Sequence, residues 1–134
     1  MHPCFVLPAL LAVAQPPLSA SEVAGYLRLI STQAQSPGRV ACRDMDMAMQ
    51  LKKAGISTDP RSTVAWAANA EQARSFQGEG KLVICADRSL VGSGAALILE
   101  QEGGKIRLLI HLGHAKASGV PLSDTLLKAA RPLS

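Results

Sequence analysis

Three methionines stand at every second position of one short stretch: Met45, Met47 and Met49 in "RDMDMAMQLKKAG". Thioether sulfur is a soft ligand that selects Cu(I), so a copper site is one interpretation of this spacing. On a helix, Met47 would point about 200° away from Met45, whereas Met49 would share the face of Met45. Because three ligands would then not converge, we expect a helix in which Met49 fills a gap in the core.

Two cysteines lie near the ends of predicted strands, Cys42 in "RVAC" and Cys85 in "KLVICAD". In an oxidising compartment they form an even pair, so a structural or redox-sensing disulfide is one interpretation. The other is two small buried hydrophobic side chains, because neighbouring parallel strands seldom offer the Cβ geometry of a disulfide. His111 and His114 could ligate a metal together with Cys85 or Asp87, but surface polar side chains are the simpler interpretation.

The sequence carries none of the motifs that mark common active sites. There is no G-x-S-x-G elbow, no H-E-x-x-H, no Walker loop and no C-x-x-C. "GSG" at 92–94 lacks the following glycine and helix of a dinucleotide fingerprint, so we expect a turn there. The net charge of +4 is modest, and the lysines and arginines are scattered along the chain. Both observations argue against a nucleic-acid partner. We therefore predict a protein with no catalytic residues, no cofactor and no metal.

The N-terminal segment is predicted to be a secretory signal peptide, residues 1–20. The apolar run that ends at Ala14 has no charged side chain and is about half as long as a membrane span. An A-x-A-like cleavage site ends at Ala14, and Ala20 is a second candidate. Cleavage would remove Cys4 and leave one domain, residues 21–134, in the periplasm.

Helix and strand patterns alternate along the middle of the chain. The segment from Ser21 to Gln35 has the apolar period of a helix, with Ser21 as its N-cap. Three β-favouring runs follow, and each leads into a helical or turning segment: "RVAC", "STVAWAA" and "KLVICAD". The first run leads into the methionine helix, which Asp44 caps and Gly55 ends. Strands that alternate with helices imply a parallel sheet with right-handed crossovers.

The pattern changes towards the C-terminus. Residues 95–101 and 105–112 are apolar runs on either side of Gly103-Gly104, which predicts a β-hairpin. "GHAKASG" follows as a short helical turn, and Ser123 is the N-cap of a last helix. The apolar face of that helix is Leu126, Leu127 and Ala130. The predicted fold class is therefore α/β: a single domain with a short, mostly parallel sheet and a C-terminal β-hairpin, flanked by helices.

A recognisable order of motifs runs through "GKLVICADRSLVGSGAALILEQEGGKIRLLIHLGHAKASGVPLSDTLLKAA". This order resembles that of the YfiR/HmsC-like periplasmic family. It consists of a Gly-Lys strand, a glycine-bearing loop, a hairpin, an Ala-rich turn, then Leu-Ser and a final helix. "VAGYLRLIS" is similar to the first helix of that family, and "RVAC" is similar to its first strand with a cysteine. Two departures are "GSGAA" in place of the family's Gly-Gly-Met loop, and His111 in place of an asparagine.

The resemblance implies a compact α/β periplasmic protein, often a homodimer, without catalysis of its own. Such a protein would bind the periplasmic part of an inner-membrane diguanylate cyclase and hold it inactive, which lowers cyclic-di-GMP signalling. Cysteines of the family suggest redox control, which would fall here on Cys42 and Cys85. The alternative is a periplasmic protein that binds a metal or a small ligand through its methionines and histidines.

Overall fold

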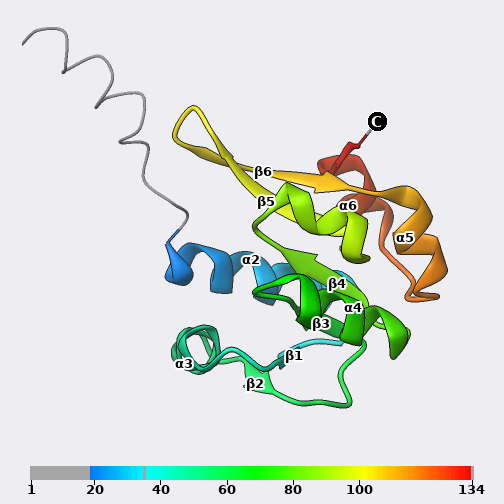
Figure 1. Cartoon of the computed structure of the whole chain (residues 1–134). Coiled ribbons are helices and arrows are strands. Elements are labelled where there is room, and N and C mark those ends of the chain that lie inside the picture. Colours follow the sequence, from blue (N-terminus) through cyan, green and yellow to red (C-terminus); the bar gives the residue numbers. More distant parts are fainter. Residues whose placement is uncertain (1–18, 35, 134) are drawn as a thin grey trace, which may run out of the picture.

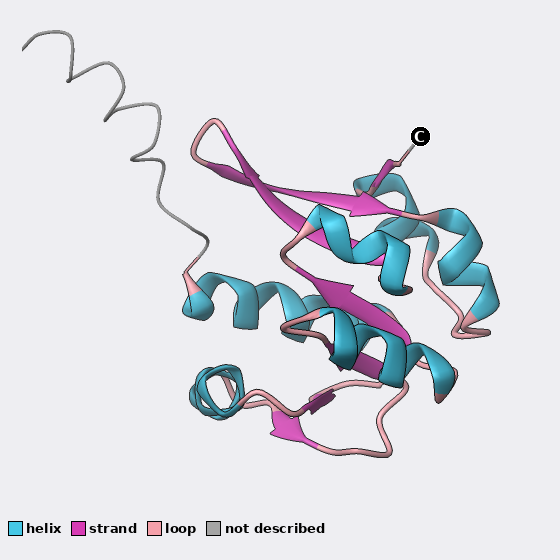
Figure 2. Cartoon of the chain, in the orientation of Figure 1, coloured by secondary structure: helices cyan, strands magenta, loops and turns pink. Residues whose placement is uncertain are grey.

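Among the residues that the structure describes, the strands form one seven-stranded sheet in the order β2-β1-β3-β4-β5-β6-β7 (Figures 1 and 2). The computed structural model describes residues 19–34 and 36–133. The strands are β1 (Arg39–Cys42), β2 (Ser57–Thr58), β3 (Val64–Trp66), β4 (Leu82–Cys85), β5 (Leu97–Glu102), β6 (Lys105–Ile110) and β7 (Arg131–Pro132). The helices are α2 (Ala20–Gln33), α3 (Met45–Lys53), α4 (Ala70–Gly78), α5 (Leu112–Ala117) and α6 (Asp124–Ala129), with a 3₁₀ helix η2 (Arg88–Ser93).

Parallel pairing dominates the sheet. β1 pairs with β2 on one side and with β3 on the other, and β4 and β5 extend the parallel part. The β5–β6 pair is the one antiparallel pair among the described strands, and β7 adds to β6 in parallel. The predicted fold class is confirmed, but β2 and β7 were not predicted, because a two-residue strand shows no readable alternation.

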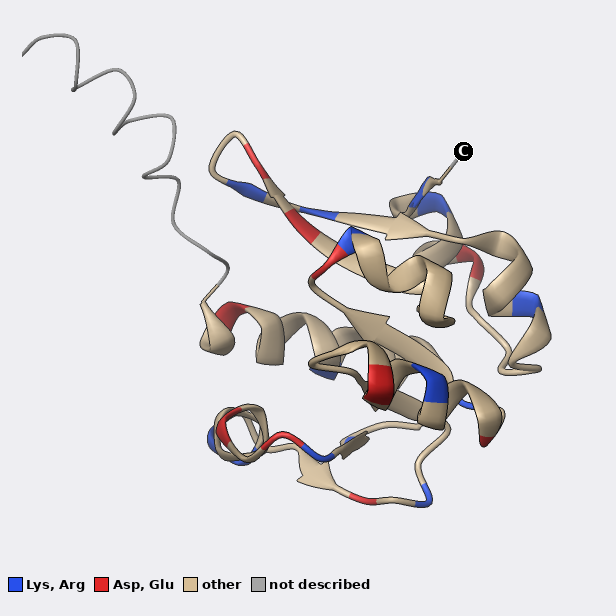
Figure 3. Ribbon diagram, viewed as in Figure 1, with Lys and Arg blue, Asp and Glu red and all other residues tan. Residues whose placement is uncertain are grey.

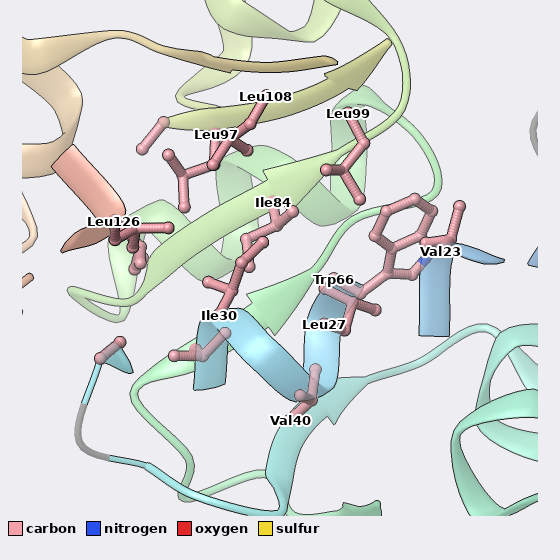
Figure 4. Packing of buried hydrophobic residues seen from close by; sticks show 14 of the residues in the cluster. Val23, Leu27, Ile30, Val40, Trp66, Ile84, Leu97, Leu99, Leu108 and Leu126 are labelled. Carbon is pink, nitrogen blue, oxygen red and sulfur yellow. The ribbon is translucent and has the colours of Figure 1, made fainter. Parts of the chain in front are cut away.

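Alternate side chains of β1, β3, β4, β5 and β6 enter two separate cores, one on each face of the sheet. We call them the aliphatic face and the alanine face. The aliphatic face is covered by α2, α3, α5 and α6, and its large side chains include those labelled in Figure 4: Val23, Leu27, Ile30, Val40, Trp66, Ile84, Leu97, Leu99, Leu108 and Leu126. The alanine face is covered by α4 and η2, and its residues are Ala41, Ala65, Ala67, Ala73, Phe76, Val83, Cys85, Leu90, Ala95, Ile98 and Leu109. Figure 1 shows α2 and α4 on opposite sides of the sheet, which gives three layers.

The helix boundaries follow local capping. Ser123 accepts a hydrogen bond from the backbone N–H of Leu126, as predicted for the last helix. The first helix begins earlier than predicted, because Ser19 and not Ser21 is its N-cap. Ser19 Oγ accepts from the backbone N–H of Glu22 at 3.1 Å and donates to its carboxylate at 2.9 Å, a Ser-x-x-Glu capping arrangement.

The hairpin has the predicted tight turn. Gly103 and Gly104 have φ of 58° and 79°, and Glu102 pairs with Lys105 across them. Positive φ at both central residues is what a two-residue type I′ turn requires, and glycine adopts it at little cost. In the last helix, Leu127 does not belong to the apolar face: its side chain is 40% exposed, whereas Leu126 is buried. α6 has six residues, and the buried pair Leu126 and Ala130 at i and i+4 already defines its inner face.

Candidate functional site

The methionine stretch forms helix α3, with Asp44 as its N-cap and Gly55 at φ 82° after its end, as predicted. The expectation that Met49 packs in the core is wrong. Met47 is buried on the aliphatic face with Leu51, whereas Met45 and Met49 are 83% and 57% exposed. The thioether of Met47 therefore lies on the opposite side of α3 from the other two, so the three sulfurs do not form one site.

The two cysteines occupy equivalent turns at the carboxyl ends of their strands. Each thiol donates to the backbone carbonyl two residues later: Cys42 to Asp44 at 3.4 Å and Cys85 to Asp87 at 3.2 Å. Each of these aspartates is the N-cap of the next helical segment. Burial raises the pKa of the Cys42 thiol, and it raises the pKa of the Cys85 thiol to about 11. Since the thiolate is the reactive form, both thiols are poor nucleophiles at neutral pH.

The cysteines are far apart for a disulfide within one chain. Both are free thiols. Strand β3 lies between β1 and β4, so Cα atoms on these strands are separated by about 9–10 Å, beyond the ~7 Å limit for a disulfide. Cys42 also packs against the aliphatic face and Cys85 lies in the alanine face. A bridge between them would require a strand to leave the sheet.

The two histidines lie at the start of helix α5. His111 is its N-cap, and His111 Nδ1 accepts from the backbone N–H of His114 at 3.0 Å. His114 Nε2 lies 3.0 Å from the carbonyl oxygen of Val91, which can only accept, so this nitrogen donates and ties α5 to η2. The two rings stack with centroids 4.0 Å apart. Within residues 19–34 and 36–133, no three side chains of His, Cys, Asp or Glu gather as a metal site.

The carboxyl ends of β1 and β3 are where an open α/β sheet of this topology often binds a ligand, because the crossovers leave them in opposite directions. Here Arg43 is engaged with α4. Its guanidinium lies 4.3 Å from the centre of the Phe76 ring and donates to Ser75 Oγ at 2.6 Å and to Glu79 at 2.7 Å. Asn69 uses its side-chain oxygen to cap α4. The Arg43 contacts join the turn after β1 to α4 and to the end of that helix.

Lys81, the lysine of the Gly-Lys motif, is nearly buried and has a structural role. Its ammonium group donates to the carbonyl oxygens of Pro60 and Ser62 at 2.7 Å each and lies 3.7 Å from Glu79. It thereby holds the short connection between β2 and β3 against the start of β4. Sequence patterns did not reveal this role, because the bonded carbonyls are far away in the chain.

Two open grooves lie at the two edges of the sheet. One, of about 630 Å³, is lined by Ala48, Met49, Lys52, Gly55, Ile56, Ser57 and Thr58, between α3 and edge strand β2. The other, of about 440 Å³, is lined by Glu102, Lys105, Ile106, Arg107, Leu108, Ala129 and Arg131, along β6 and next to β7. The large exposed hydrophobic side chains of the described residues are Leu29, Met45, Met49, Leu112 and Leu127. Met49 belongs to both sets, because it lines the first groove and is exposed.

Comparisons with known proteins agree on the fold. A solved structure, of a conserved domain protein from Vibrio cholerae O1 biovar El Tor, superposes with a TM-score of 0.63 at 15% sequence identity. The match covers 88% of this chain and 61% of that one, so this chain spans less than two thirds of its length. A search of curated proteins found no match. A sequence model described as YfiR/HmsC-like matches residues 61–131, from the β2–β3 connection through the hairpin to β7. That segment is more than half of the chain and contains the Gly-Lys strand, the glycine-bearing loop and the final helix, and the chain therefore belongs to the YfiR/HmsC-like family.

Proposed function

We propose that this protein is a periplasmic regulator that binds the periplasmic part of an inner-membrane diguanylate cyclase and holds that enzyme inactive. Cyclic-di-GMP synthesis in the cytoplasm then falls when the protein is bound. The observation that carries the proposal is the YfiR/HmsC-like match over residues 61–131.

A regulator without a reaction of its own acts by binding one state of its partner more tightly than the other. The surface of the domain supports this mode of action. Its two grooves lie open at the sheet edges, and Met45 and Met49 present adaptable apolar side chains beside one of them. The side chains considered for chemistry are engaged elsewhere: Met47 in the core, His111 and His114 in a helix cap, and both thiols in backbone hydrogen bonds.

Export to the periplasm is part of the proposal. The signal peptide, residues 1–20, lies outside the described residues except for Ser19 and Ala20. Among the described helices, none has the length and apolar character to cross a bilayer. Cleavage after Ala14 would keep the Ser19 cap of α2, whereas cleavage after Ala20 would remove it. Mass spectrometry of the native protein should give a first residue between Gln15 and Glu22, and an intact Met1 in the mature pool would contradict export.

The function is tested by deleting the gene and measuring cellular cyclic-di-GMP. We expect a rise, because the cyclase is released from repression. Complementation with the full chain should restore the low level, and complementation with a chain that lacks residues 2–14 should not, because it stays in the cytoplasm although it keeps the Ser19 cap of α2. An unchanged cyclic-di-GMP level in the deletion strain, together with no membrane partner captured by crosslinking, would overturn the proposal.

A further inference from the structure

Strand β6 has an unpaired outer edge over most of its length. β7 pairs with Leu109 and Ile110 only, so among the described residues the stretch from Lys105 to Leu108 has no strand beside it on that side. The backbone N–H of His111 donates to the carbonyl of Ala96, the residue just before β5, and the carbonyl of Ile110 accepts from Leu133 on the other side. By the alternation of an antiparallel pair, the N–H groups of Ile106 and Leu108 point away from β5, to the free edge.

The groove along this edge has a basic rim. Lys105 and Arg131 are exposed, and neither has an ion-pair partner among the described residues. The third basic side chain, Arg107, pairs with Glu102, the acidic residue that lines the groove. Figure 3 shows Lys and Arg on the β6 arm of the hairpin and Asp and Glu on the β5 arm. The side of the hairpin that carries unpaired backbone groups is therefore also the side with surplus positive charge.

We propose that the free edge of β6 binds an extended acidic segment of a partner protein, which adds to the sheet as a strand next to β6 and ahead of β7. Its backbone would bond to the Ile106 and Leu108 edge, and its acidic side chains would lie near Lys105 and Arg131. The identity of this partner as a diguanylate cyclase rests on the proposed function, but the chemistry of the site does not.

Charge selects an acidic partner over a second copy of this chain. If two β6 edges met around a twofold axis, the basic rims of both copies would face each other, and like charges opposite one another are destabilising. Basic residues on an edge strand also oppose uncontrolled pairing between copies. An acidic strand turns the same residues into attractive contacts.

The experiment combines amide hydrogen exchange with matched charge variants of the full mature protein. The first ligand is the purified periplasmic domain of a membrane diguanylate cyclase from the same organism. Binding should slow exchange at Ile106 and Leu108 and should weaken as salt is raised. The double substitution Lys105→Glu and Arg131→Glu should weaken binding by about tenfold or more. A control, Lys53→Glu with Lys116→Glu, makes the same change in net charge at exposed sites outside both grooves and should bind like the wild type.

A second ligand separates this inference from the proposed function. It is a synthetic peptide of alternating Glu and Val, compared with the same peptide N-methylated at alternate residues so that it cannot extend a sheet. The inference predicts protection at Ile106 and Leu108 with the first peptide only. Equal binding of both peptides, or protection by neither, overturns it, as does a dimer of the free protein that forms through the β6 edge. If the cyclase domain does not bind and the peptide does, the proposed function fails and the strand-binding edge stands. If the cyclase domain binds without protecting Ile106 and Leu108, and neither peptide protects them, the proposed function stands and the strand-binding edge fails.

Discussion

The two faces of the sheet are packed in different ways. The aliphatic face meets the fourteen-residue helix α2. It carries Leu, Ile, Val and Trp side chains from the five central strands, β1, β3, β4, β5 and β6. The alanine face meets shorter elements, α4 and η2, and carries alanine at four positions of the sheet and its flanking turns. Small side chains let these elements approach closely: a Cβ on Gly94, after η2, would lie 2.6 Å from the Gln77 side chain of α4.

The difference teaches which substitutions each face tolerates. On the aliphatic face, stability depends on filling volume, so removal of methylene groups should be costly. On the alanine face, space is short, so the insertion of atoms should be costly. The following predictions are ordered from the largest expected effect to the smallest.

Leu27→Ala should lower the free energy of unfolding most, by about 3–5 kcal/mol, because Leu27 is fully buried under the sheet and leaves a cavity. Leu29→Ala, on the same helix but 54% exposed, is the matched control and should change it by less than about 0.5 kcal/mol. Urea denaturation followed by circular dichroism measures both. Equal effects would mean that α2 presents another face to the core.

Met47→Ala should cost about 2 kcal/mol, in the lower part of the range for buried methionine, because α3 lies beside the short edge strand β2. Met49→Ala should cost less than about 0.5 kcal/mol, since its side chain is exposed. The same denaturation assay gives both values. A larger loss of unfolding free energy for Met49→Ala than for Met47→Ala would show that Met49 packs in the core, as the methionine spacing predicted.

Ala65→Val tests the alanine face, where the β3 side chain has no accessible surface. Two added methyl groups should lower the unfolding free energy by about 1–2 kcal/mol through overpacking. Ala68→Val, at an exposed turn after β3, controls for the change of residue type. Stabilisation by Ala65→Val would show that this face holds unfilled volume, and the contrast between the faces would be lost.

The reactivity of the two cysteines compares the faces in the wild-type protein, since Cys42 lies against the aliphatic face and Cys85 lies within the alanine face. At pH 8 only about one Cys85 in a thousand is thiolate when burial sets its pKa at about 11, so alkylation of the native protein should label the half-buried Cys42 first. Labelling of Cys85 should rise about tenfold per pH unit until the fold opens. Peptide mass mapping reads out both sites, and a non-reducing mass that showed a Cys42–Cys85 bridge would contradict the sheet order.

Local patterns in the sequence were sufficient for much of this fold. The hairpin turn requires positive φ at two successive residues, which Gly103 and Gly104 adopt. Asp44 and Ser123 cap helices through hydrogen bonds to residues three positions away. The wrong prediction of the buried face of α3 depended on distant contacts. The methionine helix has two apolar stripes, Met45 with Met49 and Met47 with Leu51, and only the position of the sheet decides which is buried.

The same limit applies to the candidate site. The roles of Lys81 and Arg43 come from hydrogen-bond partners 19 to 36 positions away, and the short pairing of β7 leaves the β6 edge open. Neither leaves a periodic signal in the sequence. The family resemblance, by contrast, was visible because it consists of consecutive motifs from the Gly-Lys strand to the last helix, and the match over residues 61–131 confirms it.

The central claim is that this protein represses a membrane diguanylate cyclase by binding it. The most direct measurement is the rate of cyclic-di-GMP synthesis by the full-length cyclase in proteoliposomes, with the purified mature protein added on the periplasmic side. The account predicts that the rate falls to a plateau as the protein is titrated, and that the protein with Lys105→Glu and Arg131→Glu requires about tenfold more to reach half of that fall. A synthesis rate that stays constant while direct binding to the proteoliposomes saturates, or an absence of binding, would contradict it.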